Sequence, residues 1–382
     1  MKQSKDNQVR AAASGPWRRM QAAGRMCCVL VASAVGLGAA LLFVMGRVGP
    51  APVEAITSPF TAHACVALCV AAAVFVALRA FRRAAALGVL CAWAAVIVGP
   101  VVLPHASAQQ AGAQHAQLDV PAERAPDEQL RVASFNALVS NAPSEEKLRW
   151  LVDTHADVLC VVECNTPWLA ALKQARENGQ LVWPHCIAQA HDDAAIGIAI
   201  LSRFPLEQAQ ILQLPGARNL HAVATAVTPG GSVRVLAVHP MSPVSIRCVG
   251  MRNDELAWLA GMCAASSAPT LVVGDFNETP YGRAFAQFVD TTGYASARNV
   301  AGVCPTWPGQ LAREHLPMLA GIPIDHVLMS RHFAPVQMQV GPYLGSDHLP
   351  VVADVLRVQG AGGLAERVEQ AGQGGSVQPA AR

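Results

Sequence analysis

The sequence predicts a layered α/β sandwich preceded by three membrane-spanning helices. Residues 128–358 alternate short β-branched runs with segments of helical periodicity, and strands and helices mixed in this order pack as layers. Residues 26–103, by contrast, contain three long stretches without a single charge. The whole chain is 52% hydrophobic and 14% charged, which is too apolar for a purely soluble protein.

The three uncharged stretches are residues 26–46, 59–78 and 84–103. As helices rising about 1.5 Å per residue, each can cross about 30 Å of hydrocarbon. A cleaved signal peptide is the alternative for the first stretch because arginines precede it, but the apolar region of a signal peptide is shorter and two further stretches follow. Ala-rich buried core helices are the alternative for all three.

Basic residues predict the orientation of these helices. Six Lys and Arg residues precede the first stretch, and Arg79, Arg82 and Arg83 lie between the second and the third. The positive-inside rule therefore places residues 1–25 and the second loop in the cytoplasm. Three spans then put the rest of the chain outside, so we expect a multi-pass protein of the cell (inner) membrane with an extracytoplasmic domain.

Two segments lack the pattern of a packed core. Residues 104–127 are rich in Ala, Gln and Pro, which predicts a flexible linker, and residues 359–382 predict a disordered tail. Between them, residues 128–358 contain 15 Lys and Arg against 19 Asp and Glu. This mildly acidic domain lacks the broad basic surface of a non-specific nucleic-acid binder, which argues against a DNA substrate without excluding it.

Cysteine spacing shows no sign of a zinc site. The chain has 11 cysteines, and those in the apolar stretches act as small hydrophobic residues. No CxxC or Cys/His pattern is present, and sequence alone cannot pair the remaining thiols, most of which we expect to be buried. These six are Cys160, Cys164, Cys186, Cys248, Cys263 and Cys304.

Each expected element of the domain follows from local periodicity and flanking turn residues. Expected strands cover residues 130–136, 158–162, 197–201, 222–227, 233–238, 270–274, 325–329 and 351–356, and expected helices cover 144–155, 166–177, 246–264 and 281–292. In the helix 246–264, Met251, Leu256, Leu259 and Met262 are expected to face a core, while Arg252 and Glu255 remain in water.

Polar residues gather at the ends of these strands. A scaffold of strands can bring such ends into one pocket, and carboxylates, amides and histidines together suit a hard cation and its acid/base partner. Taken singly, each residue could be a turn former or a packed loop residue, so the prediction depends on the whole set. The set is Asn136, Glu163, His239, Asp275, Asn277, Asp325, Asp347 and His348.

The motifs around these residues resemble a known family. ASFNALV, VLCVVEC, GIAILSRFPL, VLAVHP, LVVGDFNETP, PTWP, IDHVLMS and GSDHLPVVADV occur in the order found in the endonuclease/exonuclease/phosphatase superfamily, over roughly residues 130–357. The chain looks most like the membrane-anchored bacterial branch. The resemblance implies a four-layered α/β sandwich of two packed mixed sheets flanked by helices, and hydrolysis of phosphate esters that depends on Mg²⁺, with Mn²⁺ as a substitute.

The resemblance also implies a role for each residue of the set. Asn136, Glu163 and Asp347 would lie at the metal, with Glu163 a direct ligand. Asn277 and His239 would contact the phosphate, and Asp275 would handle a proton of the water or leaving group. His348 would be the acid/base or phosphate-stabilising group, oriented by Asp325.

Two positions depart from the family pattern. Ala137 and Leu138 follow Asn136, where some DNA-repair members carry an acidic residue, and Val162 precedes Glu163, where many relatives have glutamine. The first departure weakens a nuclease interpretation. We therefore expect a membrane-anchored phosphodiesterase whose substrate, nucleic acid or a lipid or inositol head group, stays open; the alternative is a catalytically silent phosphate-binding module. No obligate protein partner is inferred.

Five further residues are weaker candidates. Arg203 and Arg218 could bind a substrate phosphate, although a structural or solvated role is the simpler interpretation. Arg252 and Trp307 are expected to be structural, and Asn165 could assist Glu163.

Overall fold

A computed structural model describes residues 2–102, 129–316 and 321–358. The predicted linker 104–127 and tail 359–382 lie outside these residues. The chain divides into two compact units, Met1–Gly99 and Pro100–Arg382. We call them the helical unit and the sandwich domain.

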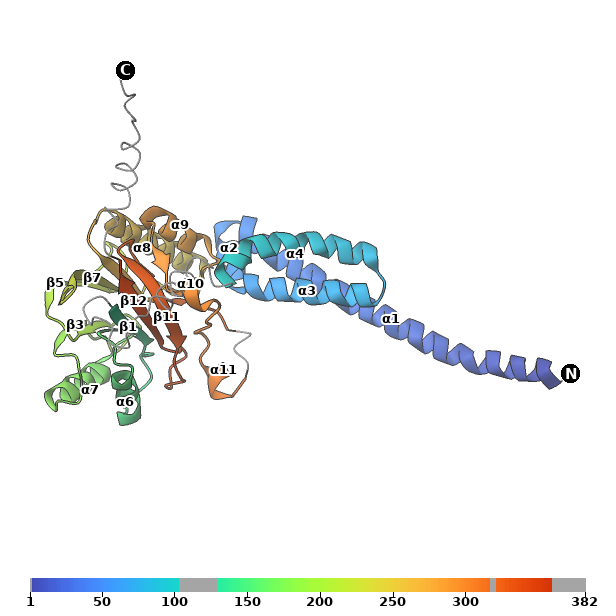
Figure 1. Ribbon diagram of the computed structural model, residues 1–382, viewed down its shortest axis with the longest axis horizontal. Helices are drawn as coiled ribbons and strands as arrows, with labels where there is room; N and C mark the ends of the chain where they lie inside the picture. Colours follow the sequence, from blue (N-terminus) through green and yellow to red (C-terminus); the bar gives the residue numbers. More distant parts are fainter. Residues whose placement is uncertain (1, 103–128, 317–320, 359–382) are drawn as a thin grey trace, which may run out of the picture. The chain divides into compact units, whose positions relative to one another are not determined.

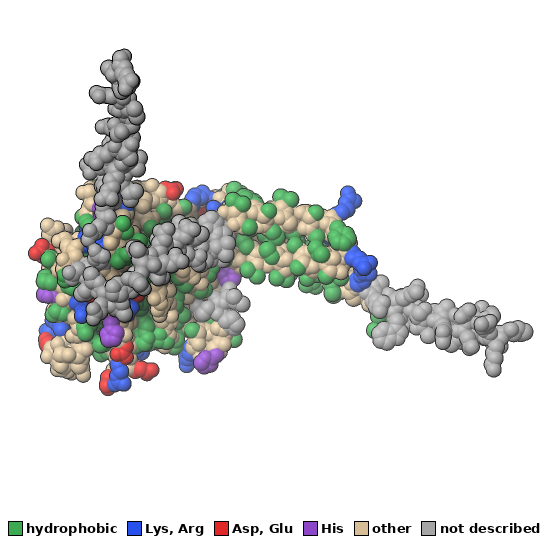
Figure 2. Space-filling view, in the orientation of Figure 1, with side chains coloured by type: hydrophobic (Ala, Val, Ile, Leu, Met, Phe, Trp, Pro, Cys, Tyr) green, Lys and Arg blue, Asp and Glu red, His purple; other side chains and the backbone are tan. Residues whose placement is uncertain are grey.

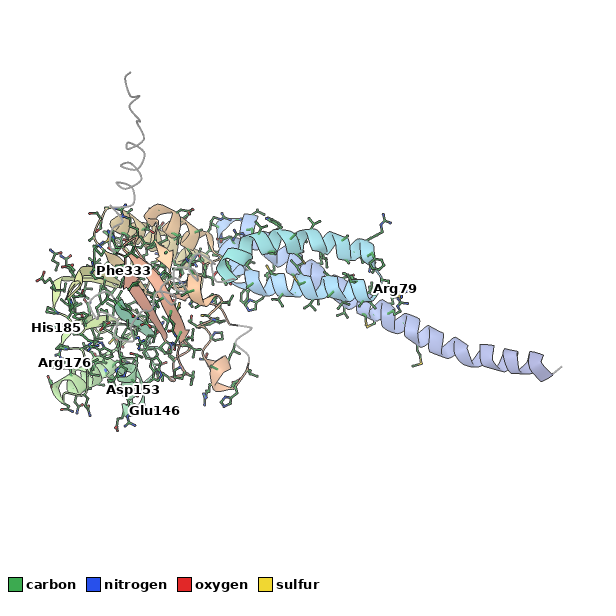
Figure 3. The ribbon with its side chains drawn as sticks, in the orientation of Figure 1. Arg79, Glu146, Asp153, Arg176, His185 and Phe333 are labelled. Atoms are coloured by element: carbon green, nitrogen blue, oxygen red, sulfur yellow. The ribbon has the colours of Figure 1, made fainter. Side chains whose placement is uncertain are left out.

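The helical unit consists of long helices that pack through small and aromatic side chains (Figure 1). Phe43 and Leu68 are fully buried, and Phe43 makes an edge contact with Trp93 at 5.0 Å between ring centroids. Figure 2 shows hydrophobic side chains along these helices and basic ones at the turn from α3 to α4, where Figure 3 labels Arg79. The elements are α1 (Lys2–Val48), α2 (Ala51–Thr57), η1 (Ser58–Phe60), α3 (Thr61–Ala77) and α4 (Phe81–Val102).

Among the described residues, two helical segments are long and apolar enough to cross a membrane, which supports membrane association only weakly. They are Ala23–Val48, which contains the first predicted span, and Ala51–Ala77, which contains the second except for its last residue. The prediction of three spans was wrong for the described side chains: α4 forms, but its first turn carries Arg82 and Arg83, and its side chains beyond residue 96 are not described. The extracytoplasmic placement relied on an odd number of spans, so two spans do not support it.

The sandwich domain contains two six-stranded sheets. The first sheet has the order β11-β12-β1-β2-β4-β3, and the second has the order β5-β6-β7-β8-β10-β9. Both are mixed, because β1–β2 and β7–β8 are parallel pairs within otherwise antiparallel sheets. The strands of the first sheet are β1 (Gln129–Asn136), β2 (Val158–Val162), β3 (His185–Gln189), β4 (Ile198–Ser202), β11 (Phe333–Val340) and β12 (Val351–Arg357). Those of the second are β5 (Leu206–Leu212), β6 (His221–Thr228), β7 (Gly231–Val238), β8 (Thr270–Asp275), β9 (Ala295–Ser296) and β10 (Asp325–Met329).

Three apolar clusters hold the layers together. The largest lies between the two sheets, where inward residues such as Val132 and Val273 are fully buried. A second cluster covers the outer face of the first sheet with α6 (Glu145–Asp153) and α7 (Thr166–Glu177), and a third covers the second sheet with α8 (Ile246–Ala264) and α9 (Arg283–Thr292). The order helix, sheet, sheet, helix in Figure 1 confirms the predicted α/β sandwich.

All eight expected strands form, and four strands were not predicted. Strands β3 and β5 lie at sheet edges and are largely half-buried or exposed, so they lack the apolar runs that mark a buried strand. Strand β11 contains Pro335 at an irregularity in its register with β12. The expected helix 281–292 begins at Arg283, after an N-cap at Gly282. The short helices α10 (Arg298–Ala301) and α11 (Gln310–Arg313) were also missed.

The expectation for α8 was wrong at two residues. Arg252 and Glu255 are 1% and 0% exposed, not solvated. Met251 and Met262 are only half-buried, whereas Leu256 and Leu259 are buried as expected. The face of α8 that carries the two charged side chains is covered by the loops that follow β7 and β8, as the contacts below show.

Candidate active site

The site lies at the edge where the parallel strands of both sheets end. Asn136 is the last residue of β1, and Glu163 follows β2. Asp275 is the last residue of β8, and its register partner on β10 is Asp325. The carboxamide of Asn136 joins the two sheets, because its Nδ2 donates to Glu163 Oε1 at 3.0 Å and to Asp275 Oδ2 at 3.1 Å.

Backbone geometry at this edge explains the GDFN motif. Gly274 has φ 147°, and a Cβ at this position would collide with the carbonyl oxygen of Val238 on β7. Only glycine therefore allows β8 to pair with β7 here. After Asp275 the chain turns, since Asn277 N donates to Asp275 Oδ1 at 2.7 Å. This Asx turn, rather than the pleat of a strand, brings Asp275 and Asn277 to one side.

Two site residues adopt left-handed backbone conformations. Glu163 has φ 55° and Asn277 has φ 49°, a region that non-glycine residues occupy rarely and that clusters at functional sites. Both conformations are held by hydrogen bonds. Val139 N donates to Glu163 Oε2 at 3.1 Å, and Asn277 Nδ2 donates to Pro240 O at 3.0 Å.

A histidine and two aspartates form the buried centre of the site. His348 Nδ1 bonds to Asp325 Oδ2 at 2.9 Å, and its Nε2 lies 3.5 Å from Asp275 Oδ2. Ser346 fixes this arrangement, because its hydroxyl donates to Asn136 O at 2.7 Å and accepts from His348 N at 3.0 Å. The serine of the GSDH motif thus ties the histidine to the end of β1.

Burial and charge set the protonation of this centre. Burial acts to lower the pKa of His348, but the carboxylates of Asp325 and Asp275 outweigh it and raise the pKa to about 10. Burial acts to raise the pKa of Asp325, but His348 outweighs it, so this pKa lies below its ordinary value. Burial raises the pKa of Asp275 to about 6, against the opposing effect of His348. The centre is therefore an ion pair beside a carboxyl group that titrates near neutrality.

The remaining predicted residues lie around this centre. His239 Nε2 is 3.6 Å from Asp275 Oδ2 and 3.9 Å from Glu163 Oε1. Asp347 is half-buried, and its Oδ2 accepts from Trp307 Nε1 at 3.2 Å. Seven of the eight residues thus form one connected set in the structure. Asp347 is the residue before His348, and its charge helps to raise the pKa of His348.

The donors of the site fit a hard divalent cation. Asp275, Asp325 and His348 each offer an atom within 4.8 Å of the others. In addition, Asp325 Oδ1 and Asp347 Oδ1 are buried without a hydrogen-bond partner among the described residues. Carboxylate oxygens dominate the set, and a buried carboxylate oxygen without a hydrogen bond is costly unless a cation or proton lies beside it. The tightest group thus consists of residues assigned to catalysis rather than to metal binding.

Several buried arginine and histidine residues near the site were missed or expected to be structural. Arg298 is 2% exposed and donates to Asp325 O and to Cys304 O. His326 bonds to Glu278 O at 2.9 Å, and burial together with Arg298 lowers its pKa to about 3. The sequence signal that could have revealed such residues is an isolated charge within an apolar period, as at Arg252 in α8.

The weaker candidates and the cysteines have structural surroundings. Arg203 pairs with Asp157 at 3.2 Å, and Asn165 caps α7 by accepting from Trp168 N. All six cysteines of the sandwich domain are free thiols. Of these, Cys160, Cys164 and Cys263 are buried, so the expectation that most are buried holds for half of them.

The family model for the Endonuclease/Exonuclease/phosphatase family matches residues 133–348. The chain belongs to this family. The matched range contains all eight predicted site residues, from Asn136 to His348. Members of this family hydrolyse phosphate esters and typically depend on a divalent metal.

Solved structures of low similarity include other members of the family. An endonuclease/exonuclease/phosphatase from Beutenbergia cavernae is 21% identical over 60% of this chain and 72% of its own, with a TM-score of 0.48. TDP2 of D. rerio in complex with a single-strand DNA product is 15% identical over 59% of this chain and 98% of its own, with a TM-score of 0.48. Truncated TDP2 of Caenorhabditis elegans is 16% identical over 60% and 98%, with a TM-score of 0.47. No curated protein sequence matches the chain.

Proposed function

We propose that the sandwich domain is a divalent-metal-dependent phosphoesterase that cleaves phosphodiester bonds, or phosphomonoester bonds, by in-line attack of water. The observation that carries the proposal is the His348–Asp325 ion pair at 2.9 Å, which lies beside Asp275 and is linked through Asn136 to Glu163. A phosphodiester repels anionic nucleophiles, so its hydrolysis needs neutralising charge and a positioned water molecule.

The ion would be held by Glu163, Asn136 and Asp347, and Mg²⁺ or Mn²⁺ suits their oxygen atoms. Bound there, it would supply positive charge to the phosphate oxygens. Asn136 Nδ2 already donates to Glu163, which leaves its Oδ1, now bonded to Leu138 N at 3.0 Å, as the amide's ligand atom.

The side chains of the centre have complementary tasks. Asp275, with a pKa of about 6, is ionised in neutral solution and can accept the proton of the attacking water. His348 carries a positive charge that Asp325 stabilises, and its Nε2 can stabilise or protonate the departing oxygen. Asn277 and His239 act as donors toward the non-bridging phosphate oxygens, whose charge grows in the transition state.

The rival function is a silent phosphate-binding module. All eight predicted positions are occupied by residues capable of these tasks, which favours catalysis. Purified full-length protein in detergent should hydrolyse bis-p-nitrophenyl phosphate, lose this activity on addition of a chelator, and regain it with Mg²⁺. Binding of inorganic phosphate without any turnover would favour the silent module instead.

One exposed loop bears on the choice of substrate. The segment after Pro240 exposes Val244 by 83% and Ile246 by 68%, and Pro240 itself accepts a hydrogen bond from Asn277. Large apolar side chains exposed to water favour contact with an apolar group, and the same chain carries two helices suited to a bilayer. A lipid phosphodiester therefore fits better than nucleic acid. A panel of sphingomyelin, inositol phosphates, DNA and RNA tests this choice.

Membrane anchoring through Ala23–Val48 and Ala51–Ala77 completes the proposal. Extracytoplasmic placement of the sandwich domain additionally requires α4 to cross. Alkaline phosphatase fused after residue 358 reports this side directly: high phosphatase activity supports the outer placement, and activity at the background of a cytoplasmic fusion refutes it.

A further inference from the structure

A buried network of three charged residues and one histidine lies beside the site, and none of its members was expected there. Arg252 and Glu255 are separated by three positions on α8 and are 1% and 0% exposed. Glu278 and His221 are equally buried, at 1% and 0%. Burying so many charges is costly, and an apolar core would be a simpler way to hold α8 to the sheet.

Arg252 holds the loop that follows β8. Its Nη1 donates to Asn277 O at 2.9 Å, and its Nη2 lies 2.8 Å from Glu278 Oε2. The other carboxylate oxygen of Glu278 accepts from Thr279 N at 2.9 Å. One guanidinium group therefore holds both the backbone carbonyl of Asn277 and the side chain of the next residue, Glu278. The φ of Asn277, 49°, is unfavourable without such support.

Glu255 holds the loop that follows β7. Its Oε2 accepts from Met241 N at 2.8 Å, and its Oε1 faces His221 Nε2 at 3.7 Å. Neither His221 Nε2 nor Glu255 Oε1 has a hydrogen-bond partner among the described residues. His221 Nδ1 accepts from His239 N at 3.2 Å, so neutral His221 carries its proton on Nε2, toward Glu255. The Glu255 carboxylate thus contacts the chain after Pro240 directly, at Met241 N, and faces the histidine that bonds the chain before Pro240, at His239 N.

The two loops are also joined directly, because Asn277 Nδ2 donates to Pro240 O at 3.0 Å. Asn219 adds a further restraint by donating to His239 O at 2.8 Å. Together, the two charged residues of α8 set the positions of the two side chains assigned above to the phosphate, His239 and Asn277.

We propose that Arg252 and Glu255 are positioning residues for the hydrolytic reaction, which hold Asn277 and His239 in register with Asp275. This inference rests on the proposed function. Neither residue touches the reacting atoms, so the effect of each passes through the loop it holds. Displacing a catalytic group by about 1 Å can cost about 10²-fold in rate, and the loss should appear in kcat because the donors act on charge that grows in the transition state.

The first test replaces Arg252 by lysine. Lysine keeps the charge but carries its three N–H groups on a single nitrogen, so it cannot reproduce the planar fork in which Nη1 reaches Asn277 O and Nη2 reaches Glu278. We expect Arg252→Lys to lower kcat on bis-p-nitrophenyl phosphate at least about 10-fold with KM nearly unchanged. The matched control is Arg131→Lys, which weakens the Arg131–Asp354 pair (2.7 Å) on the other sheet and should leave kcat unchanged. Equal kcat for both variants would overturn the proposal.

A mutant cycle separates positioning from general stability. If Arg252 acts through Asn277, Arg252→Lys should have little further effect on kcat in an Asn277→Ala background, whereas it should keep its full effect in a Glu163→Gln background. A purely structural role would give the same loss in both backgrounds, which would refute positioning. Residual rates can be compared because both backgrounds retain part of the site.

A second variant perturbs the network without removing any charge. Gly282 has φ −80°, which alanine also adopts, but its added Cβ would collide with the carboxylate of Glu278. Gly282→Ala should therefore displace Glu278 from Arg252 and lower kcat, even if Arg252→Lys does not fold. Unaltered kcat in folded Gly282→Ala would count against the proposal.

Amide hydrogen exchange provides a readout that does not depend on activity. Glu255→Gln and Arg252→Lys should accelerate exchange at the amides of His239 and Met241 and of residues 276–278, while exchange in β1 and β2 stays as in the wild type. Uniform acceleration throughout the domain would refute a positioning role. If the wild type hydrolyses no phosphodiester, the proposed function fails on that result alone, and the exchange pattern still decides whether α8 holds these loops.

Discussion

Replacing Asp325 by asparagine should remove most of the charge from His348 at alkaline pH. The two side chains bond at 2.9 Å. The carboxylates of Asp325 and Asp275 raise the pKa of His348 from its ordinary value of 6.5 to about 10. The difference corresponds to about 5 kcal/mol between the two protonation states. Asparagine has a similar shape but no charge, so the pKa of His348 should fall back to its ordinary value or below.

The rate should follow the charged fraction of His348. At pH 8, a group with a pKa of about 10 is about 99% charged, and one with a pKa of 6.5 is about 3% charged. Asp325→Asn should therefore lower kcat on bis-p-nitrophenyl phosphate at least about 30-fold at pH 8 and by a smaller factor near pH 6. A full pH profile of kcat, measured for both proteins at saturating Mg²⁺, checks this. A loss of equal size at every pH would refute the reasoning.

The same pair predicts how stability depends on pH. Because the pKa of His348 is higher in the folded protein, its contribution is fully present below pH 6.5 and is lost as pH rises through about 10. The free energy of unfolding of the wild type should therefore fall as the pH rises over this range. The free energy of unfolding of the Asp325→Asn variant should fall less. Denaturant titrations at pH 6, 8 and 10 measure this difference.

Other substitutions test the remaining parts of the site. Asp275→Ala should lower kcat at least about 10²-fold, and near-normal turnover would remove Asp275 from the role of proton acceptor. Glu163→Gln should weaken the activation constant for Mg²⁺ about 10-fold or more, measured by metal titration of the rate, and an unchanged constant would mean that another residue holds the ion. Gly274→Ala should destabilise the fold by about 2–4 kcal/mol, since its Cβ would meet the Val238 carbonyl; thermal unfolding at the wild-type temperature would contradict this. Val244→Ser combined with Ile246→Ser should slow hydrolysis of sphingomyelin in vesicles but not of bis-p-nitrophenyl phosphate, and equal effects on both would argue against a lipid substrate.

The sequence predicted the strands that pass through the core but not those at the sheet edges. Val158–Val162 and Asp325–Met329 were predicted to the residue, because every residue in them is buried and the apolar run has clear ends. Strand β5 has four consecutive exposed residues, so its hydrophobic pattern is weak. Its pairing with β6 is a tertiary effect that no local pattern contains.

The site residues were predictable because they sit at strand ends, where a polar residue interrupts an apolar run. What the sequence could not supply is how they are held. Taken singly, Asp275 could be a turn former, and the structure contains an Asx turn at this residue and also brings Asp275 and Asn277 into the site. A local turn and a functional position are therefore compatible.

Helical periodicity also failed at α8 for a physical reason. Arg252 and Glu255 are charged, and a pattern based on hydrophobicity assigns such residues to water. Their partners, Glu278 and the N–H of Met241, lie outside the helix, in the loops that follow β8 and β7. Only the tertiary structure reveals that these charges are paired and buried.

Diffraction from crystals grown with Mn²⁺ would test most directly whether these side chains surround one ion. Anomalous scattering should give a single strong peak in contact with Glu163, close to Asp275 and His348, and Glu163→Gln should reduce it. A peak held by other residues, or none at this edge of the two sheets under conditions where the protein is active, would contradict the account.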